Sequence, residues 1–172
     1  MIVSPSEQLV FLCQPRTGSK AASRALLAIG WRQVGIHHHS LDTRLITPET
    51  IVMSTIRNHF DWLGSMWRQW MSEPFAKFIN RLVIHDMPRE DHFVPFVQRR
   101  GDEYAAFWKY LPLTTHVLRY ERLQEDLSDT LSQRIRLPEE MREAPRDYRR
   151  LYDAGTRGIV NRAFYNEIRS IT

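Results

Sequence analysis

The chain has 172 residues, of which 42% are hydrophobic and 26% are charged, and its formal net charge at pH 7 is +4. This composition is typical of a globular protein with a packed core and excludes a disordered chain. No apolar run reaches the roughly 18 residues of a membrane span, and the first residues lack the pattern of a signal peptide. We therefore expect a single domain over residues 1–172, located in the cytoplasm and without a membrane partner.

Short apolar runs predict strands, and the amphipathic runs between them predict helices. The expected strands cover residues 8–13, 31–36, 49–56 and 115–119. The expected helices cover residues 19–29, 58–70, 74–83, 93–111, 121–133 and 156–168. Strands that alternate with helices imply an α/β fold, with a parallel β-sheet flanked by helices on both faces. Cys13, the single cysteine, ends the first strand and is expected to be a buried, inert thiol.

In a parallel sheet, ligands bind at the carboxyl ends of the strands. This rule selects three polar segments of the chain, which are residues 15–20, 37–40 and 57–65. Each of them follows a predicted strand directly.

The first segment joins a buried strand to a helix, with Ser19 as the expected N-cap. The free backbone N–H groups at such a helix start, with the positive end of the helix dipole, form an anion site. Arg16 and Lys20 add cations, Thr17 and Ser19 add hydroxyl donors, and Gly18 allows the turn. An ordinary capped turn with solvated charges accounts for the same residues. The first glycine of a Walker loop is absent, which disfavours an ordinary ATPase or GTPase.

The second segment contains Arg57, at the end of a predicted strand, and Ser65, eight residues later on the next helix. Ser65 should point away from the helix stripe of Phe60, Leu63, Trp67 and Trp70, and therefore toward solvent or a ligand. An arginine and a hydroxyl together suit a phosphate monoester. A surface arginine and a solvated serine are the alternative.

The third segment contains His37, His38 and His39. A histidine near neutrality can accept the proton of a reacting hydroxyl group. A solvated loop cluster is the main alternative, and a metal site would need a further, distant ligand. We favour His38 or His39 as the base.

The order and spacing of these segments resemble the sulfotransferases that use 3′-phosphoadenosine-5′-phosphosulfate (PAPS). That family has a P-K-[ST]-G-[ST] loop after its first strand, and an arginine at a later strand end followed by a serine eight residues on. This chain has PRTGS at 15–19 and the pair Arg57 and Ser65. Residues 116–121, HVLRYE, resemble the family's late strand, and residues 156–168 resemble the closing helix of its carbohydrate-type branch.

The resemblance covers residues 8 to 170 and implies a P-loop-like sulfotransferase fold, with PAPS as co-substrate and no metal. By this resemblance Arg16, Thr17, Gly18, Ser19 and Lys20 bind the 5′-phosphosulfate, and Arg57 and Ser65 bind the 3′-phosphate. The acceptor would be a hydroxyl group of a small molecule or carbohydrate, and one of His37, His38 and His39 would be its base.

One departure from the family pattern is Arg16, where a lysine is common. A guanidinium is a fixed planar fork and not a mobile point charge, so activity is not assured by the motif alone, although Lys20 could supply the mobile cation. The alternatives are a nucleotide-binding protein or kinase that uses ATP, and an inactive protein of the same fold that only binds the nucleotide. A nucleic-acid partner is not expected, because the basic residues are dispersed among acids.

Overall fold

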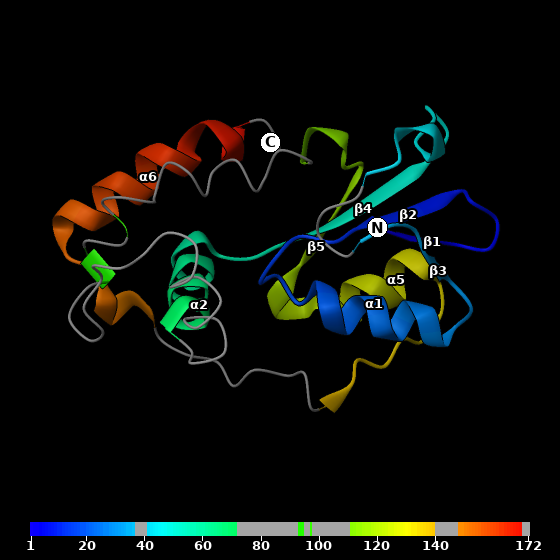
Figure 1. Cartoon of the computed structure of the whole chain (residues 1–172), viewed down its shortest axis with the longest axis horizontal. Helices are drawn as coiled ribbons and strands as arrows, with labels where there is room; N and C mark the ends of the chain where they lie inside the picture. Colours follow the sequence, from blue (N-terminus) through cyan, green and yellow to red (C-terminus); the bar gives the residue numbers. More distant parts are fainter. Residues whose placement is uncertain (37–40, 72–92, 95–96, 98–110, 140–147, 170–172) are drawn as a thin grey trace. The chain divides into compact units, whose positions relative to one another are not determined.

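The computed structural model describes residues 1–36, 41–71, 93–94, 97, 111–139 and 148–169 (Figure 1). The chain forms two compact units. The first contains residues 1–57 and 109–144, and the second contains residues 58–108 and 145–172. The single domain expected from the sequence stays a prediction.

The first unit is built on a mixed five-stranded sheet with the strand order β3-β1-β2-β4-β5 (Figure 1). Its strands are β1 (Ile2–Val3), β2 (Leu9–Leu12), β3 (Arg32–Gln33), β4 (Ile51–Ile56) and β5 (His116–Arg119). β2, β4 and β5 pair in parallel, whereas β1 pairs antiparallel with both β2 and β3. The fold is therefore α/β as expected, and the predicted parallel sheet is present in β2, β4 and β5, whereas the antiparallel pairing of β1 with β2 and β3 was not expected.

The antiparallel part of the sheet comes from two strands of two residues each, which are too short to give a readable alternation pattern. β1 turns directly into β2, and the Leu9 backbone N–H donates to the Ser4 side chain at 3.1 Å across this turn. β3 covers only two exposed residues of the strand expected at 31–36. Because β3 is antiparallel to β1, and β1 to β2, the carboxyl end of β3 lies at the same sheet edge as that of β2.

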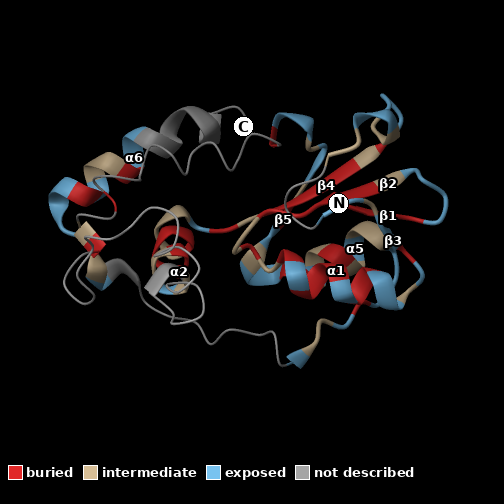
Figure 2. Ribbon diagram, viewed as in Figure 1, coloured by how far each residue is buried: buried red, intermediate tan, exposed pale blue. Residues whose placement is uncertain are grey.

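Alternating residues of the strands form two separate cores, one on each face of the sheet (Figure 2). On one face, Phe11 and Met53 pack with residues of α1 (Ser19–Ala28) and α5 (Leu123–Leu131). On the other face, Val10 and Val52 pack against Leu45 in η1 (Thr43–Leu45). The two described helices of this unit thus cover the same face, which differs from the expected helices on both faces. Cys13 belongs to the first core, where burial raises the pKa of its thiol, so the prediction of a buried thiol is confirmed.

The end of β5 is clamped to α5 by one carboxylate. Asp126 accepts the backbone N–H of Arg119 at 2.7 Å, and its two oxygens also accept from Nε and Nη2 of the Arg119 guanidinium at 3.0 and 2.7 Å. These bonds hold the pKa of Asp126 below its usual value. Between the strand and the helix lies η4 (Tyr120–Arg122), so the clamp also fixes where this short turn begins.

The second unit contains α2 (His59–Met71), η6 (Tyr148–Leu151) and α6 (Ala154–Arg169). The Asn58 side chain accepts the backbone N–H of Phe60 at 3.1 Å and begins α2. Tyr152 packs edge-on against Phe60 and Phe93, with ring centroids 4.9 and 4.6 Å away, and its hydroxyl donates to the Phe60 carbonyl at 2.8 Å. This aromatic cluster connects the start of α2 to the segment before α6.

The helices expected at 19–29, 58–70, 121–133 and 156–168 are confirmed to within a few residues as α1, α2, α5 and α6. The helix expected at 74–83 lies outside the described residues, and so does most of the helix expected at 93–111. No helix in the described part of the chain is both long and apolar enough to cross a membrane.

Replacing Asp126 with Asn should lower the free energy of unfolding at pH 7 by about 1 kcal/mol, because a charged acceptor is lost while its arginine partner stays half-exposed. Since the folded-state pKa of Asp126 is lowered, its contribution is complete above the unfolded pKa of about 3.9 and is lost as the pH falls through the folded value. Urea unfolding of both proteins between about pH 3 and pH 7 measures this. The difference should shrink only at the acid end.

The control is Asp129→Asn, which removes an exposed carboxylate from the same helix. If both variants lose the same free energy of unfolding, or if the loss in Asp126→Asn does not depend on pH, the hydrogen bonds of Asp126 to Arg119 do not stabilise the fold as proposed.

Candidate anion-binding site

Three parallel strands of the first unit end side by side. The register pairs Leu12 of β2 with Ser54 of β4, and Ile56 of β4 with Arg119 of β5. The residues that follow the strands are therefore neighbours at one sheet edge. They are the loop at 14–20 after β2, Arg57 after β4 and Tyr120 after β5.

Two buried hydroxyls close the loop onto its first residue. Thr17 Oγ1 donates to the Gln14 carbonyl oxygen at 2.9 Å, and Ser19 Oγ donates to the same oxygen at 2.5 Å. Thr17 is completely buried and Ser19 almost completely. In this structure both hydroxyls hold the loop together, and their predicted binding of an anion stays a prediction.

The backbone of the loop alternates in handedness. Arg16 has a φ of +60° and Gly18 a φ of +75°, whereas the φ of Thr17 between them is not positive. Such alternation turns successive N–H groups toward one side, as in the concave backbone sites that bind anions. The φ values of the loop are compatible with such a site, and anion binding by the loop stays a prediction.

The start of α1 differs in one detail from the expectation. Its N-cap is Gly18 and not Ser19, and no side chain caps the helix. The prediction of Ser19 as the N-cap is wrong, because the Gly18 carbonyl accepts the first helix bond, from the Ala22 N–H at 3.0 Å, and the Ser19 hydroxyl donates to the Gln14 carbonyl instead of accepting a backbone N–H. The first turn contains no acidic residue that would oppose an anion.

Arg57 contacts this loop directly. Its Nη1 donates to the Arg16 carbonyl oxygen at 3.2 Å, and its Cζ lies 4.1 Å from the centroid of the Tyr120 ring. Only 8% of the residue is exposed. The two cationic segments that the sequence assigns to neighbouring strand ends, the loop and Arg57, are thus in contact within one unit.

Tyr120 also contacts the loop. A Cβ added to Gly18 would lie 2.9 Å from Leu123 Cδ2 and 3.0 Å from Tyr120 Cδ2, so the loop backbone packs closely on both side chains. Tyr120 is not among the site residues predicted from the sequence, although it lies within the motif at 116–121. The strand-end rule applied to β5 would have found it, since Tyr120 is the first residue after that strand.

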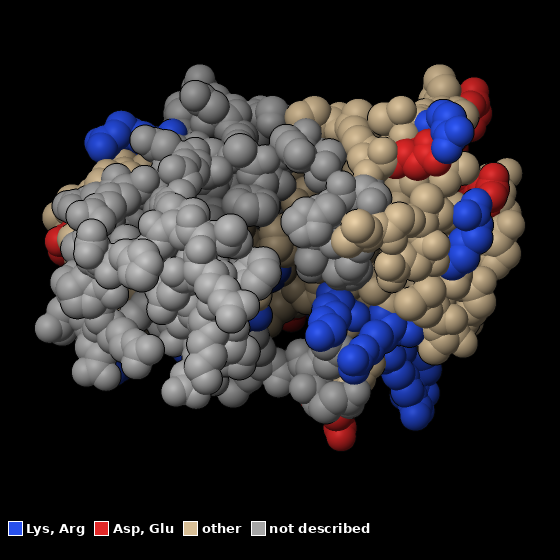
Figure 3. All heavy atoms as spheres, in the orientation of Figure 1, with Lys and Arg blue, Asp and Glu red and all other residues tan. Residues whose placement is uncertain are grey.

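The other predicted site residues are less closely grouped. Lys20 is exposed at the first turn of α1, and on the face drawn in Figure 3 basic side chains gather over this helix. His37, His38 and His39 lie outside the described residues. Among the residues that the structure does describe, no group of three or more His, Cys, Asp or Glu side chains could hold a metal ion.

Ser65 belongs to the second unit and is completely buried in α2, so it does not point to solvent, and the alternative that it faces a ligand stays a prediction. Trp62 and Met66, four residues apart, are buried beside it. They form a second apolar stripe that the choice of Phe60, Leu63, Trp67 and Trp70 overlooked. The pairing of Ser65 with Arg57 stays a prediction.

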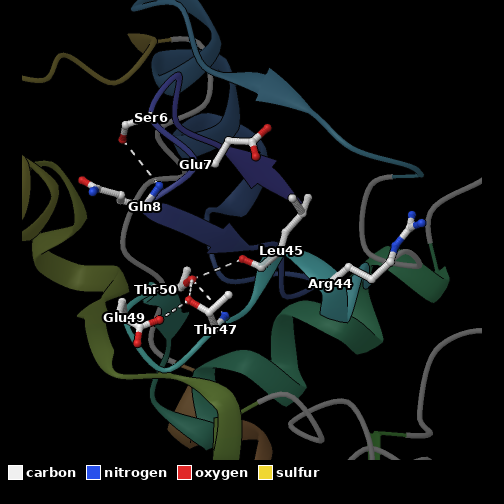
Figure 4. A pocket seen from close by; sticks show the side chains of 8 residues that line it. All are labelled: Ser6, Glu7, Gln8, Arg44, Leu45, Thr47, Glu49 and Thr50. Carbon is white, nitrogen blue, oxygen red and sulfur yellow. Dashed lines mark hydrogen bonds between the residues drawn. The ribbon is translucent and has the colours of Figure 1, made fainter.

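A polar depression of about 170 Å³ lies at the opposite sheet edge, before β2 and β4 (Figure 4). Its two threonine hydroxyls bond within the turn that precedes β4. Thr47 Oγ1 donates to Glu49 at 2.8 Å, and Thr50 Oγ1 donates to the Leu45 carbonyl at 3.3 Å. These bonds explain the turn, and we do not consider this depression the functional site.

Three comparisons with known proteins gave no match, since no family model, no curated protein and no solved structure is similar to this chain. The functional interpretation therefore depends on the residues of the sequence and the contacts at the strand ends.

Replacing Gly18 with Ala should destabilise the first unit by about 2 kcal/mol or more, because a left-handed backbone and a close contact with Leu123 and Tyr120 act together. Gly30→Ala is the matched control. Gly30 also has a positive φ, of +90°, but a Cβ there would meet nothing within 4 Å. Its cost should be about 1 kcal/mol. Denaturant unfolding of both variants measures the difference, and equal costs would show that the loop does not pack tightly on these side chains.

Proposed function

We propose that this chain is a sulfotransferase with a P-loop-like sulfotransferase fold, which moves the sulfuryl group of PAPS to a hydroxyl group, such as one of a carbohydrate. The observation that carries the proposal is the contact of the Arg57 guanidinium with the loop after β2. A donor with a phosphate on each side of its ribose needs two cationic segments close together, and this contact supplies them at one sheet edge.

The composition of the site suits a polyanion. The loop supplies backbone N–H groups at an uncapped helix start, and Arg16, Lys20 and Arg57 supply positive charge. We assign the 5′-phosphosulfate to the backbone N–H groups of residues 16–20, because the hydroxyls of Thr17 and Ser19 already donate to Gln14. Arg57 is assigned to the 3′-phosphate.

The reaction needs a base, a positioned acceptor and stabilisation of the leaving group. The acceptor oxygen would attack sulfur in line while the bond from sulfur to the bridging phosphate oxygen breaks. The acceptor proton would pass to one of His37, His38 and His39, which gives a sulfate ester and adenosine 3′,5′-bisphosphate. Arg16 would stabilise the charge that develops on the leaving phosphate, so positioning and electrostatics supply most of the rate.

The direction of β3, the strand before the histidine segment, is compatible with the role proposed for that segment. β3 precedes this segment, and its carboxyl end lies at the same sheet edge as that of β2. The chain therefore leaves β3 toward the edge that contains the anion-binding loop.

Adenosine 3′,5′-bisphosphate should bind the protein more tightly than ATP or adenosine 5′-monophosphate in isothermal titration calorimetry. Replacing Arg57 with Ala should weaken bisphosphate binding by about 10- to 150-fold, which corresponds to about 1.5–3 kcal/mol for a charged hydrogen bond. Arg44→Ala is the matched control, because the Arg44 side chain is 87% exposed and pairs with Asp42 at the opposite edge. An unchanged affinity in Arg57→Ala would refute the assignment of the 3′-phosphate.

Transfer itself is tested with radiolabelled PAPS and a panel of glycans and small alcohols. Activity should be lost in a variant in which His37, His38 and His39 are all replaced by Ala, while bisphosphate affinity is kept. Tight binding by the wild-type protein without transfer to any acceptor would favour the inactive alternative.

A further inference from the structure

The Tyr120 side chain contacts both halves of the proposed site, which are Arg57 and the loop after β2. Its ring face lies under the Arg57 guanidinium, at 4.1 Å from Cζ to the ring centroid. Its ring edge, at Cδ2 and Cε2, lies against Gly18 in the loop after β2. The segments that follow β2 and β4 therefore each bring a residue to this ring, which itself follows β5.

The position of Tyr120 is fixed from both sides along the chain. The preceding residue, Arg119, is held by three hydrogen bonds to Asp126. Three residues after Tyr120, the side chain of Leu123 is buried in the core, with a relative exposure of 3%. A ring attached between two such anchors has little freedom to move, so it can act as a rigid support.

The Arg57 guanidinium needs such a support because it is largely removed from water. A buried cation is costly unless neighbouring groups compensate its charge. The Arg16 carbonyl provides one hydrogen bond, and the negative face of the Tyr120 ring provides a second favourable contact. Together they determine in which plane the guanidinium lies, and a planar fork binds a phosphate well only in a defined plane.

We infer that Tyr120 is a positioning residue that holds the Arg57 guanidinium in the plane required for the 3′-phosphate, and that it thereby determines selectivity for a 3′-phosphorylated nucleotide. This inference rests on the proposed function, because the ligand of Arg57 is assigned there. It goes beyond that assignment, because selectivity for the 3′-phosphate would depend on Tyr120 after β5 as well as on Arg57 after β4.

The test compares Tyr120→Phe, which keeps the ring face, with Tyr120→Leu, which keeps an apolar side chain but has no ring. In calorimetric titrations, Tyr120→Leu should bind adenosine 3′,5′-bisphosphate about five- to thirty-fold more weakly, and Tyr120→Phe should stay within about twofold of the wild type. Affinity for adenosine 5′-monophosphate, which has no 3′-phosphate, should change less than about twofold in both. If Tyr120→Leu does not fold, Tyr120→Met replaces it.

A double-mutant cycle with Arg57→Ala separates positioning from other roles. The effect of Tyr120→Leu should disappear in the Arg57→Ala background, because Tyr120 acts through that guanidinium. If the effect persists there, or if the monophosphate affinity falls equally, Tyr120 contacts the nucleotide or merely supports the loop, and the inference is overturned.

A measurement without ligand distinguishes this inference from the proposed function. In ¹⁵N- and ¹³C-labelled protein, the side-chain signals of Arg57 should show a ring-current shift that is kept in Tyr120→Phe and lost in Tyr120→Leu. If the wild type binds no bisphosphate but the shift is present, the proposed function is wrong while the contact stands. If the shift is absent from the wild type, the positioning role is wrong whatever the ligand.

Discussion

The buried guanidinium of Arg57, placed between the Arg16 carbonyl and the Tyr120 ring, is the contact on which the candidate site depends. It joins the ends of β2, β4 and β5, and the segments after β2 and β5 are each fixed by a different local interaction. The loop after β2 is closed by hydroxyls that donate to Gln14, and the turn after β5 is held by the Asp126 clamp. A cation placed in this way is rigid before any ligand arrives, which is the condition under which it binds an anion at low entropic cost.

The small residues of the loop, Thr17, Gly18 and Ser19, have structural roles in the loop itself. Thr17 and Ser19 look like phosphate donors in the sequence, yet in the fold their hydroxyls are already bonded to a carbonyl and buried. Gly18 supplies both the left-handed backbone and the space for Leu123 and Tyr120. An anion site here would thus consist mainly of backbone N–H groups, and such groups are positioned by the loop's own bonds and not by side-chain rotamers.

Several features follow from local sequence. The buried runs of β2 and β4 and the helix starts near residues 19 and 59 were predicted because hydrophobic period and polar helix-start residues act over a few neighbouring positions. β1 and β3 were missed or misjudged because two residues contain no period, and their pairing is decided by strands distant in the chain. Ser65 was misjudged for a related reason, since one helix can be buried on two sides and the sequence does not say how many partners it has.

By itself, the sequence determined that an α/β sheet would have cationic segments at its strand ends, because the order of strands, glycine and basic residues is a local property of the chain. Only the tertiary structure decided that Arg57 touches the loop, that Tyr120 lies beneath it and that the hydroxyls of Thr17 and Ser19 point inward. The physical reason is that strand order and register bring together residues up to about a hundred positions apart, and no pattern within a short window of the chain contains that information.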